Sequence, residues 1–158
     1  MRKILFWISA SAALIISQIA MAETVKIGFV TTLTGGAGAI GNDMRDAVEL
    51  ALDHLGRKMG GSDIKMFYED DTFKPDVGKQ KTEKLVKKDK VHFVTGYIWS
   101  HVLLASRNSV VGKGPFMITS NAGPGPVAGK LCHEDFFQHH GKTTKLPWQW
   151  VRCSINWV

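Results

Sequence analysis

The histidines of this sequence lack metal-ligand spacing, and its cysteines are few. His54, His92 and His101 stand singly, so no metal site is expected. The only two cysteines are Cys132 and Cys153, and there is no internal repeat or low-complexity tract. The two cysteines could pair in an oxidising compartment. However, Cys153 lies in residues 138–158, whose sequence differs in character from the rest of the chain. We therefore expect Cys132 to be a buried or unpaired thiol.

A strong net charge is also missing from the body of the chain. The formal charge is +6, but five of the 20 basic residues lie outside residues 23–137. The 15 that remain stand against 14 acids, all within that range, which leaves a charge of +1. The lysines of residues 74–90 are interleaved with acids at a spacing that covers the outside of a helix, and few aromatic residues lie nearby to stack on bases. No nucleic-acid partner is therefore expected.

A catalytic signature is missing as well. Ser100 has no G-x-S-x-G context, so it does not resemble a hydrolase nucleophile, and we expect neither an enzyme nor a cofactor. One alternative is an exported NAD-binding α/β enzyme fragment, because Gly36, Gly38 and Gly41 fit G-x-G-x-x-G before a helix. The tight turn of that motif is absent, and the acids of residues 69–71 follow about thirty residues later instead of about twenty. Two other interpretations are a flexible loop over a helix N-terminus and a loop whose amides bind an anionic ligand.

The N-terminus has the pattern of a secretory signal. Met1–Lys3 is basic, the run to Ala20 is almost wholly apolar, and Ala20–Ala22 offers small residues for signal peptidase. The apolar run is short and has no stop-transfer flank, which favours a signal peptide over a membrane span. Residues 1–22 are thus predicted to be removed, and the mature chain, which begins at Glu23, is expected in the periplasm.

The rest of the chain alternates strand and helix patterns. Period-two or continuous apolar runs predict strands, and apolar residues at three- and four-residue spacing predict helices. Asn42 or Asp43 is the expected cap of the first helix. This order predicts an α/β fold, a Rossmann-like parallel sheet with helices on both faces, whose ligand-facing loops leave the carboxyl ends of the strands. The predicted strands are 24–30, 64–68, 91–95 and 115–119, and the predicted helices are about 42–55, 75–88 and 100–110.

Seven segments resemble a known family in their order and spacing: Val25–Gly35, Asp70-Asp71, Pro75, Lys84–Val86, Asp89–Val91, Gly96–Ser100 and Met117–Gly123. It is that of the leucine/isoleucine/valine-binding-protein-like solute receptors of ABC importers, which are two-lobed type I periplasmic binding proteins. The resemblance covers residues 23–137 and implies the N-terminal lobe of such a receptor. It also implies a small-molecule ligand and an inner-membrane ABC permease as partners.

The resemblance implies a ligand site after the third and fourth strands. Ser100 would donate a hydroxyl hydrogen bond to a ligand carboxylate, and Trp99 would form an apolar or stacking wall. The backbone of the Asn121-Ala122-Gly123 segment would complete an anion nest. Branched-chain amino-acid receptors usually carry Ala and Thr where Asn121 and Gly123 stand, so amino acids and aromatic or aliphatic carboxylates all remain ligand classes. Core packing of Trp99 and helix capping by Ser100 are the structural alternatives.

Residues 138–158 change character. They hold three of the five tryptophans and show neither a helical nor a strand period. Reading each codon from its third base after Phe137 permits S-T-P-W-Q-N-D-Q-T-P-M-A-M-G, which resembles the continuation of the family. We therefore expect an aberrant tail produced by one missing base near Phe136-Phe137, and a partial lobe of 23–137 without a second lobe. The underlying nucleotide sequence tests this hypothesis.

Overall fold

The computed structural model describes residues 23–139 and 150–151. Its centre is a sheet in the order β2-β3-β1-β4-β5-β6-β7. The five strands from β3 to β6 run parallel, and the short strands β2 and β7 pair antiparallel at the two edges. The strands are β1 (Val25–Thr31), β2 (Lys58–Met59), β3 (Ser62–Asp70), β4 (Phe93–Thr95), β5 (Phe116–Thr119), β6 (Phe136–His139) and β7 (Trp150–Val151).

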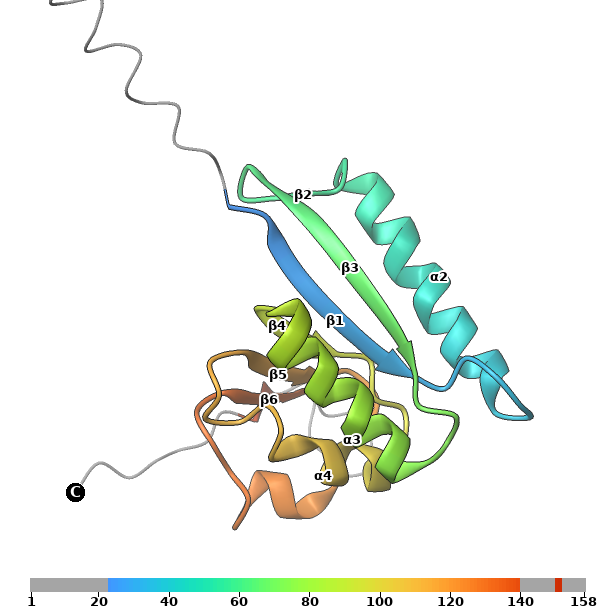
Figure 1. Cartoon of the computed structure of the whole chain (residues 1–158), viewed down its shortest axis with the longest axis vertical. Coiled ribbons are helices and arrows are strands. Elements are labelled where there is room, and N and C mark those ends of the chain that lie inside the picture. Colours follow the sequence, from blue (N-terminus) through green and yellow to red (C-terminus); the bar gives the residue numbers. More distant parts are fainter. Residues whose placement is uncertain (1–22, 140–149, 152–158) are drawn as a thin grey trace, which may run out of the picture.

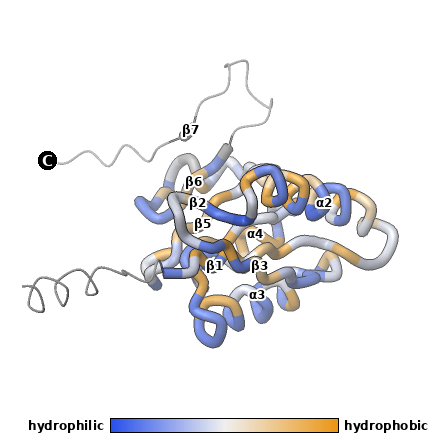
Figure 2. Tube along the Cα trace, turned by 90° about the horizontal axis from the view of Figure 1, so that it is seen from above, coloured by the Kyte–Doolittle hydropathy of each residue, from blue (hydrophilic) through white to orange (hydrophobic). Residues whose placement is uncertain are grey.

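Helices cover both faces of the sheet, as predicted (Figures 1 and 2). Side chains alternate along a strand, so Phe29 and Tyr68 point to the face of α2 (Gly38–His54), where Tyr68 donates a hydrogen bond to Glu49. Val30 and Val94 point to the opposite face, which is covered by α3 (Pro75–Lys84) and α4 (Ser100–Arg107). A π-helical turn, Leu85–Asp89, extends α3, and a 3-10 turn, Gly125–Ala128, follows β5.

The best-packed core lies between β1, β4, β5, β6 and the α3–α4 pair. Val30, Val94, Val102, Leu103 and Met117 are completely buried there. The backbone of β1 is close to the π-helical turn, because a Cβ on Gly28 would lie 2.7 Å from Leu85 Cδ1. No helix among the described residues is long and apolar enough to span a bilayer.

Several predicted boundaries are wrong. The first helix begins at Gly38, and its N-cap residue is Ala37 without a side-chain cap bond. Asn42 lies inside that helix and donates its amide N–H groups to the carbonyls of Leu33 and Gly38. The helix that begins at Ser100 ends at Arg107 and not near Val110.

Two expectations concern the end of the chain. Cys132 is disulfide-bonded and only partly buried, so the expectation of a buried or unpaired thiol is wrong. Cys153 lies outside the described residues. Phe137 and Gln138, which stand on either side of the predicted tail boundary, belong to the same strand and pair with Ile118 and Thr119. Most of residues 138–158 lie outside the described part of the chain.

Candidate functional site

Four loops meet where the parallel strands end. They follow β1, β3, β4 and β5, and the carboxyl ends of parallel strands lie at one edge of the sheet. Gly96 begins the β4 loop with a φ of +104°, where a Cβ would lie 2.9 Å from the Val30 carbonyl oxygen. Only glycine therefore allows β4 to turn so close to β1. We call this the carboxyl edge.

The first two predicted site residues lie at the N-terminus of α4. Trp99 is the N-cap residue, in extended conformation, and Ser100 is the first residue of the helix. Ser100 is thus not the cap, and within the described residues its exposed hydroxyl makes no hydrogen bond. The first N–H groups of a helix have no intrahelical acceptor and carry a partial positive charge. The Ser100 hydroxyl and the first N–H groups of α4 are therefore hydrogen-bond donors without partners among the described residues. Such a combination suits an anion.

The predicted segment after β5 lies beside this helix. The Ala122 backbone N–H donates to the Tyr97 carbonyl at 3.0 Å, and the Ala122 carbonyl accepts from the Thr119 hydroxyl at 2.7 Å. Both backbone groups of the buried Ala122 are thus used by the fold. Asn121 and Gly123 are exposed on either side of it. A Cβ on Gly123 would lie 2.8 Å from Gln138 Nε2, so a side chain there would displace the Gln138 amide.

Sequence reasoning missed the residues that hold Trp99 in place. The Trp99 indole N–H donates to the Thr32 hydroxyl at 2.9 Å, and that hydroxyl donates to Asp71 Oδ1 at 2.5 Å. The Phe73 ring meets the Trp99 ring edge-on at 4.7 Å between centroids, and His101 lies 5.0 Å from Phe73. The Asp70-Asp71 pair that follows a predicted strand was the available signal, but its partners in other loops could not be read from spacing.

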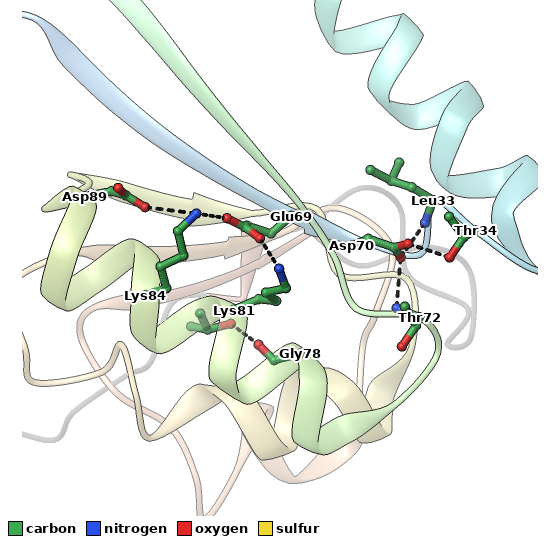
Figure 3. A network of polar contacts seen from close by, with 10 residues as sticks. Leu33, Thr34, Glu69, Asp70, Thr72, Gly78, Lys81, Lys84 and Asp89 are labelled. Carbon is green, nitrogen blue, oxygen red and sulfur yellow. Dashed lines mark hydrogen bonds and ion pairs between the residues drawn. The ribbon is translucent and has the colours of Figure 1, made fainter.

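Asp70 ties the β1 loop to the β3 loop (Figure 3). Its Oδ1 accepts from the backbone N–H groups of Leu33 and Thr72, both at 2.9 Å, and its Oδ2 accepts from the Thr34 hydroxyl at 2.5 Å. Burial alone would raise the pKa of Asp70, but these hydrogen bonds stabilise the charged form and hold the pKa below its usual value. The carboxylate therefore fixes the geometry of both loops at neutral pH.

Glu69 forms a second polar cluster on the α3 side (Figure 3). Lys81 lies 2.9 Å from Glu69 Oε2, and Lys84 contacts Oε1. Burial would raise the pKa of Glu69, but the two lysines outweigh it and lower the pKa. The other lysines of residues 74–90 are exposed, as expected for a solvated helix face.

The glycines of the G-x-G-x-x-G pattern differ in their surroundings. A Cβ on Gly41 would lie 1.8 Å from the Thr32 carbonyl oxygen, and one on Gly38 would lie 2.7 Å from that of Leu33. A Cβ on Gly36 would meet nothing within 4 Å. The last two glycines therefore allow α2 to pack against the backbone of the β1 loop, which accounts for them without a dinucleotide.

The opposite, amino edge of the sheet carries a different feature. An open cavity of about 380 Å³ lies there, lined by Val86, Lys90, Val91, His92, Phe93, Lys113, Gly114, Pro115 and Phe116. Its two lysines are exposed, and none of the predicted site residues borders it. Among the described residues, no group of His, Cys, Asp and Glu side chains could hold a metal ion.

Comparisons with known proteins agree on one family. The model of the periplasmic binding protein family matches residues 24–152, a range that extends past Phe137. The tail boundary at that residue stays a prediction. A Leu/Ile/Val-binding protein of Rhizobium johnstonii is 28% identical over 113 residues, which are 70% of this chain and 30% of that protein.

Solved structures give the same result. An ABC transporter substrate-binding protein from Sphaerobacter thermophilus is 29% identical with a TM-score of 0.69, over 73% of this chain and 32% of that one. An R. palustris ABC transporter solute-binding protein in complex with benzoate is 25% identical, also with a TM-score of 0.69 and the same coverage. The chain thus spans about a third of the length of these relatives, which corresponds to one lobe of a type I periplasmic binding protein.

Proposed function

The chain belongs to the periplasmic binding protein family, and on that premise we propose that it forms a ligand-binding lobe of an ABC importer's receptor. The ligand is a small carboxylate, either an amino acid or an aromatic or aliphatic acid. Residues 1–22 direct its export and are then removed. Mass spectrometry of protein recovered from the periplasm should therefore show a chain that begins at Glu23, and an intact Met1 would contradict this. Its other partner is the inner-membrane permease.

One observation carries the proposal: the hydrogen-bond donors at the start of α4 have no acceptor among the described residues. The Ser100 hydroxyl is exposed and has no partner among the described residues, and the first amides of the helix lie beside it. Trp99 is half-buried directly before it, which supplies apolar surface next to the anion-binding groups. A carboxylate with an apolar body matches this combination.

No catalytic step is needed for this function. A receptor of this class works by closing two lobes around its ligand, and the closed form is recognised by the permease. A single lobe leaves the far side of the ligand in water while the loss of translational freedom is unchanged. We therefore expect residues 23–158 alone to bind weakly, and soluble monomer with micromolar affinity would show that one lobe suffices.

The test is a titration of the chain with benzoate and isoleucine, followed by NMR of the Ser100 amide. In the receptor whose reading frame is restored after Phe137, Ser100→Ala removes a hydrogen bond to a charged group, worth about 1.5–3 kcal/mol, so affinity should fall about tenfold to more than a hundredfold. Ser109→Ala is the matched control, because Ser109 follows the other end of α4 and contacts Glu83. Equal affinities for the two variants would remove Ser100 from the site.

A further inference from the structure

The orientation of the Trp99 ring is set by a buried carboxylate that it does not touch. The indole N–H donates to Thr32 Oγ1, and Thr32 Oγ1 donates to Asp71 Oδ1. Thr32 and Asp71 are both completely buried. The threonine hydroxyl has a single proton, so its bond to Asp71 forces its lone pair toward the indole. The carboxylate therefore decides which way the hydroxyl points and, through it, where the indole edge lies.

The same carboxylate oxygen also holds Phe73. The Phe73 backbone N–H donates to Asp71 Oδ1 at 2.9 Å. Thr72 and Phe73 have φ values of +50° and +64°, a conformation that costs non-glycine residues free energy and persists only when the surroundings enforce it. The result is an aromatic ring that stays 47% exposed at the carboxyl edge. Its plane is nearly perpendicular to that of Trp99, at 89°.

Asp71 has no other evident task. It forms no ion pair with a described residue, and its Oδ2 is buried without a hydrogen bond there. A buried carboxylate with one unpaired oxygen is costly. Stability alone would be better served by a neutral side chain, so a positional role explains the acid better than a packing role does.

From this geometry we infer that Asp71 is a positioning residue of the ligand site. Through Thr32 and through the Phe73 backbone, it fixes two rings as one aromatic wall beside the Ser100 anion site. Two preorganised rings at right angles favour a ligand whose apolar body is itself a flat ring. Aromatic pairs gain binding free energy beyond that of the buried area, and rings that are already fixed lose no conformational freedom on binding. The ligand class is thus an aromatic carboxylate, an inference that rests on the proposed function.

The positioning claim is tested without ligand. Thr32→Val keeps the shape of the side chain and removes the hydroxyl, whereas Thr32→Ser keeps the hydroxyl. The experiment uses the chain purified from the periplasm, and the Trp99 indole N–H resonance is assigned by its loss in Trp99→Phe. This resonance should shift in the valine variant. Its exchange with solvent should quicken about five- to tenfold. The serine variant should restore both. An unchanged indole signal in Thr32→Val overturns the positioning role.

The ligand class is tested with two acids of similar size. Benzoate is flat, whereas cyclohexanecarboxylate is puckered and has no π face. NMR titration should give benzoate a dissociation constant about two- to tenfold lower, a ratio that falls to about one in Thr32→Val and Phe73→Leu. Equal binding of both acids to the unaltered chain overturns the aromatic preference and leaves the proposed function standing. If neither of these acids moves the Ser100 amide, the inference fails, and if isoleucine does not move it either, the proposed function fails as well.

Discussion

The two edges of the sheet differ in what they hold. At the carboxyl edge, hydrogen bonds from side-chain hydroxyls to carboxylates fix the loops, and two consecutive residues have positive φ. At the amino edge lies an open cavity of about 380 Å³ with exposed lysines, and its lining is held mainly by backbone hydrogen bonds such as that from the Phe116 N–H to the His92 carbonyl. Volume alone would place the ligand at the amino edge. We propose the carboxyl edge because of its organised polar groups, since binding needs groups held in position before the ligand arrives.

The largest expected effect comes from Gly41→Ala. The new Cβ would lie 1.8 Å from the Thr32 carbonyl oxygen, so α2 or the β1 loop must move and the Thr32 hydroxyl with it. The free energy of unfolding should fall by about 3 kcal/mol or more, measured by urea denaturation. Gly36→Ala, which meets nothing within 4 Å, should change it by less than about 1 kcal/mol. Equal losses of stability in the two variants would mean that both glycines act through the conformation of the loop and that Gly41 has no special packing role.

A smaller effect is expected from Asp70→Asn, which weakens the bonds between the β1 and β3 loops. An amide is a poorer acceptor than a carboxylate, so stability at pH 7 should fall by about 1–2 kcal/mol. The folded pKa of Asp70 lies below its usual value of 3.8, so its contribution is present above that pH and is lost as the pH falls through the folded pKa.

Urea denaturation at pH 7 and near pH 3 measures the difference between the two proteins. The deficit of the variant should shrink at the lower pH, because below 3.8 the unfolded chain takes up the proton and the advantage of the folded carboxylate is progressively lost. A deficit that is the same at both pH values would show that the charge of Asp70 contributes nothing.

The smallest effect is expected at the amino edge. Lys90 has a φ of +53° after the π-helical turn, where its backbone N–H bonds the Leu85 carbonyl. Glycine adopts this conformation freely, so Lys90→Gly should raise the melting temperature slightly, for a gain of about 1 kcal/mol or less. Lys88→Gly, inside the turn, should instead destabilise by about 1 kcal/mol. Benzoate affinity should not change in either variant, and a clear loss in Lys90→Gly would favour the amino edge as the site.

Much of the fold could be predicted from the sequence because apolar periodicity records which faces are buried. The order of the predicted strands and helices is confirmed, and Val102 and Leu103 of the predicted third helix are completely buried. The start of α2 was misplaced because Asn42 has the chemistry of a cap, whereas its amide donates to carbonyls inside the helix. Strand β6 was missed because its few residues show no alternation that differs from the loop before them.

The site was predictable only where position along the chain determines it. Trp99 and Ser100 follow a buried strand and stand at the start of a helix, which sequence alone indicates. The partners of Trp99 come from other loops, since Thr32 is 67 residues away and Phe73 belongs to the β3 loop. Only the register of parallel strands brings them together, and neither spacing nor composition encodes that register locally.

The most direct test of the account is to map where benzoate binds on the chain. Backbone NMR spectra recorded with increasing benzoate would show every affected amide at once. We predict changes at the carboxyl edge, centred on Trp99, Ser100, Asn121 and Gly123 and reaching Phe73. Changes centred instead on His92, Lys113 and Phe116 at the amino edge, or no changes at all, would contradict the account.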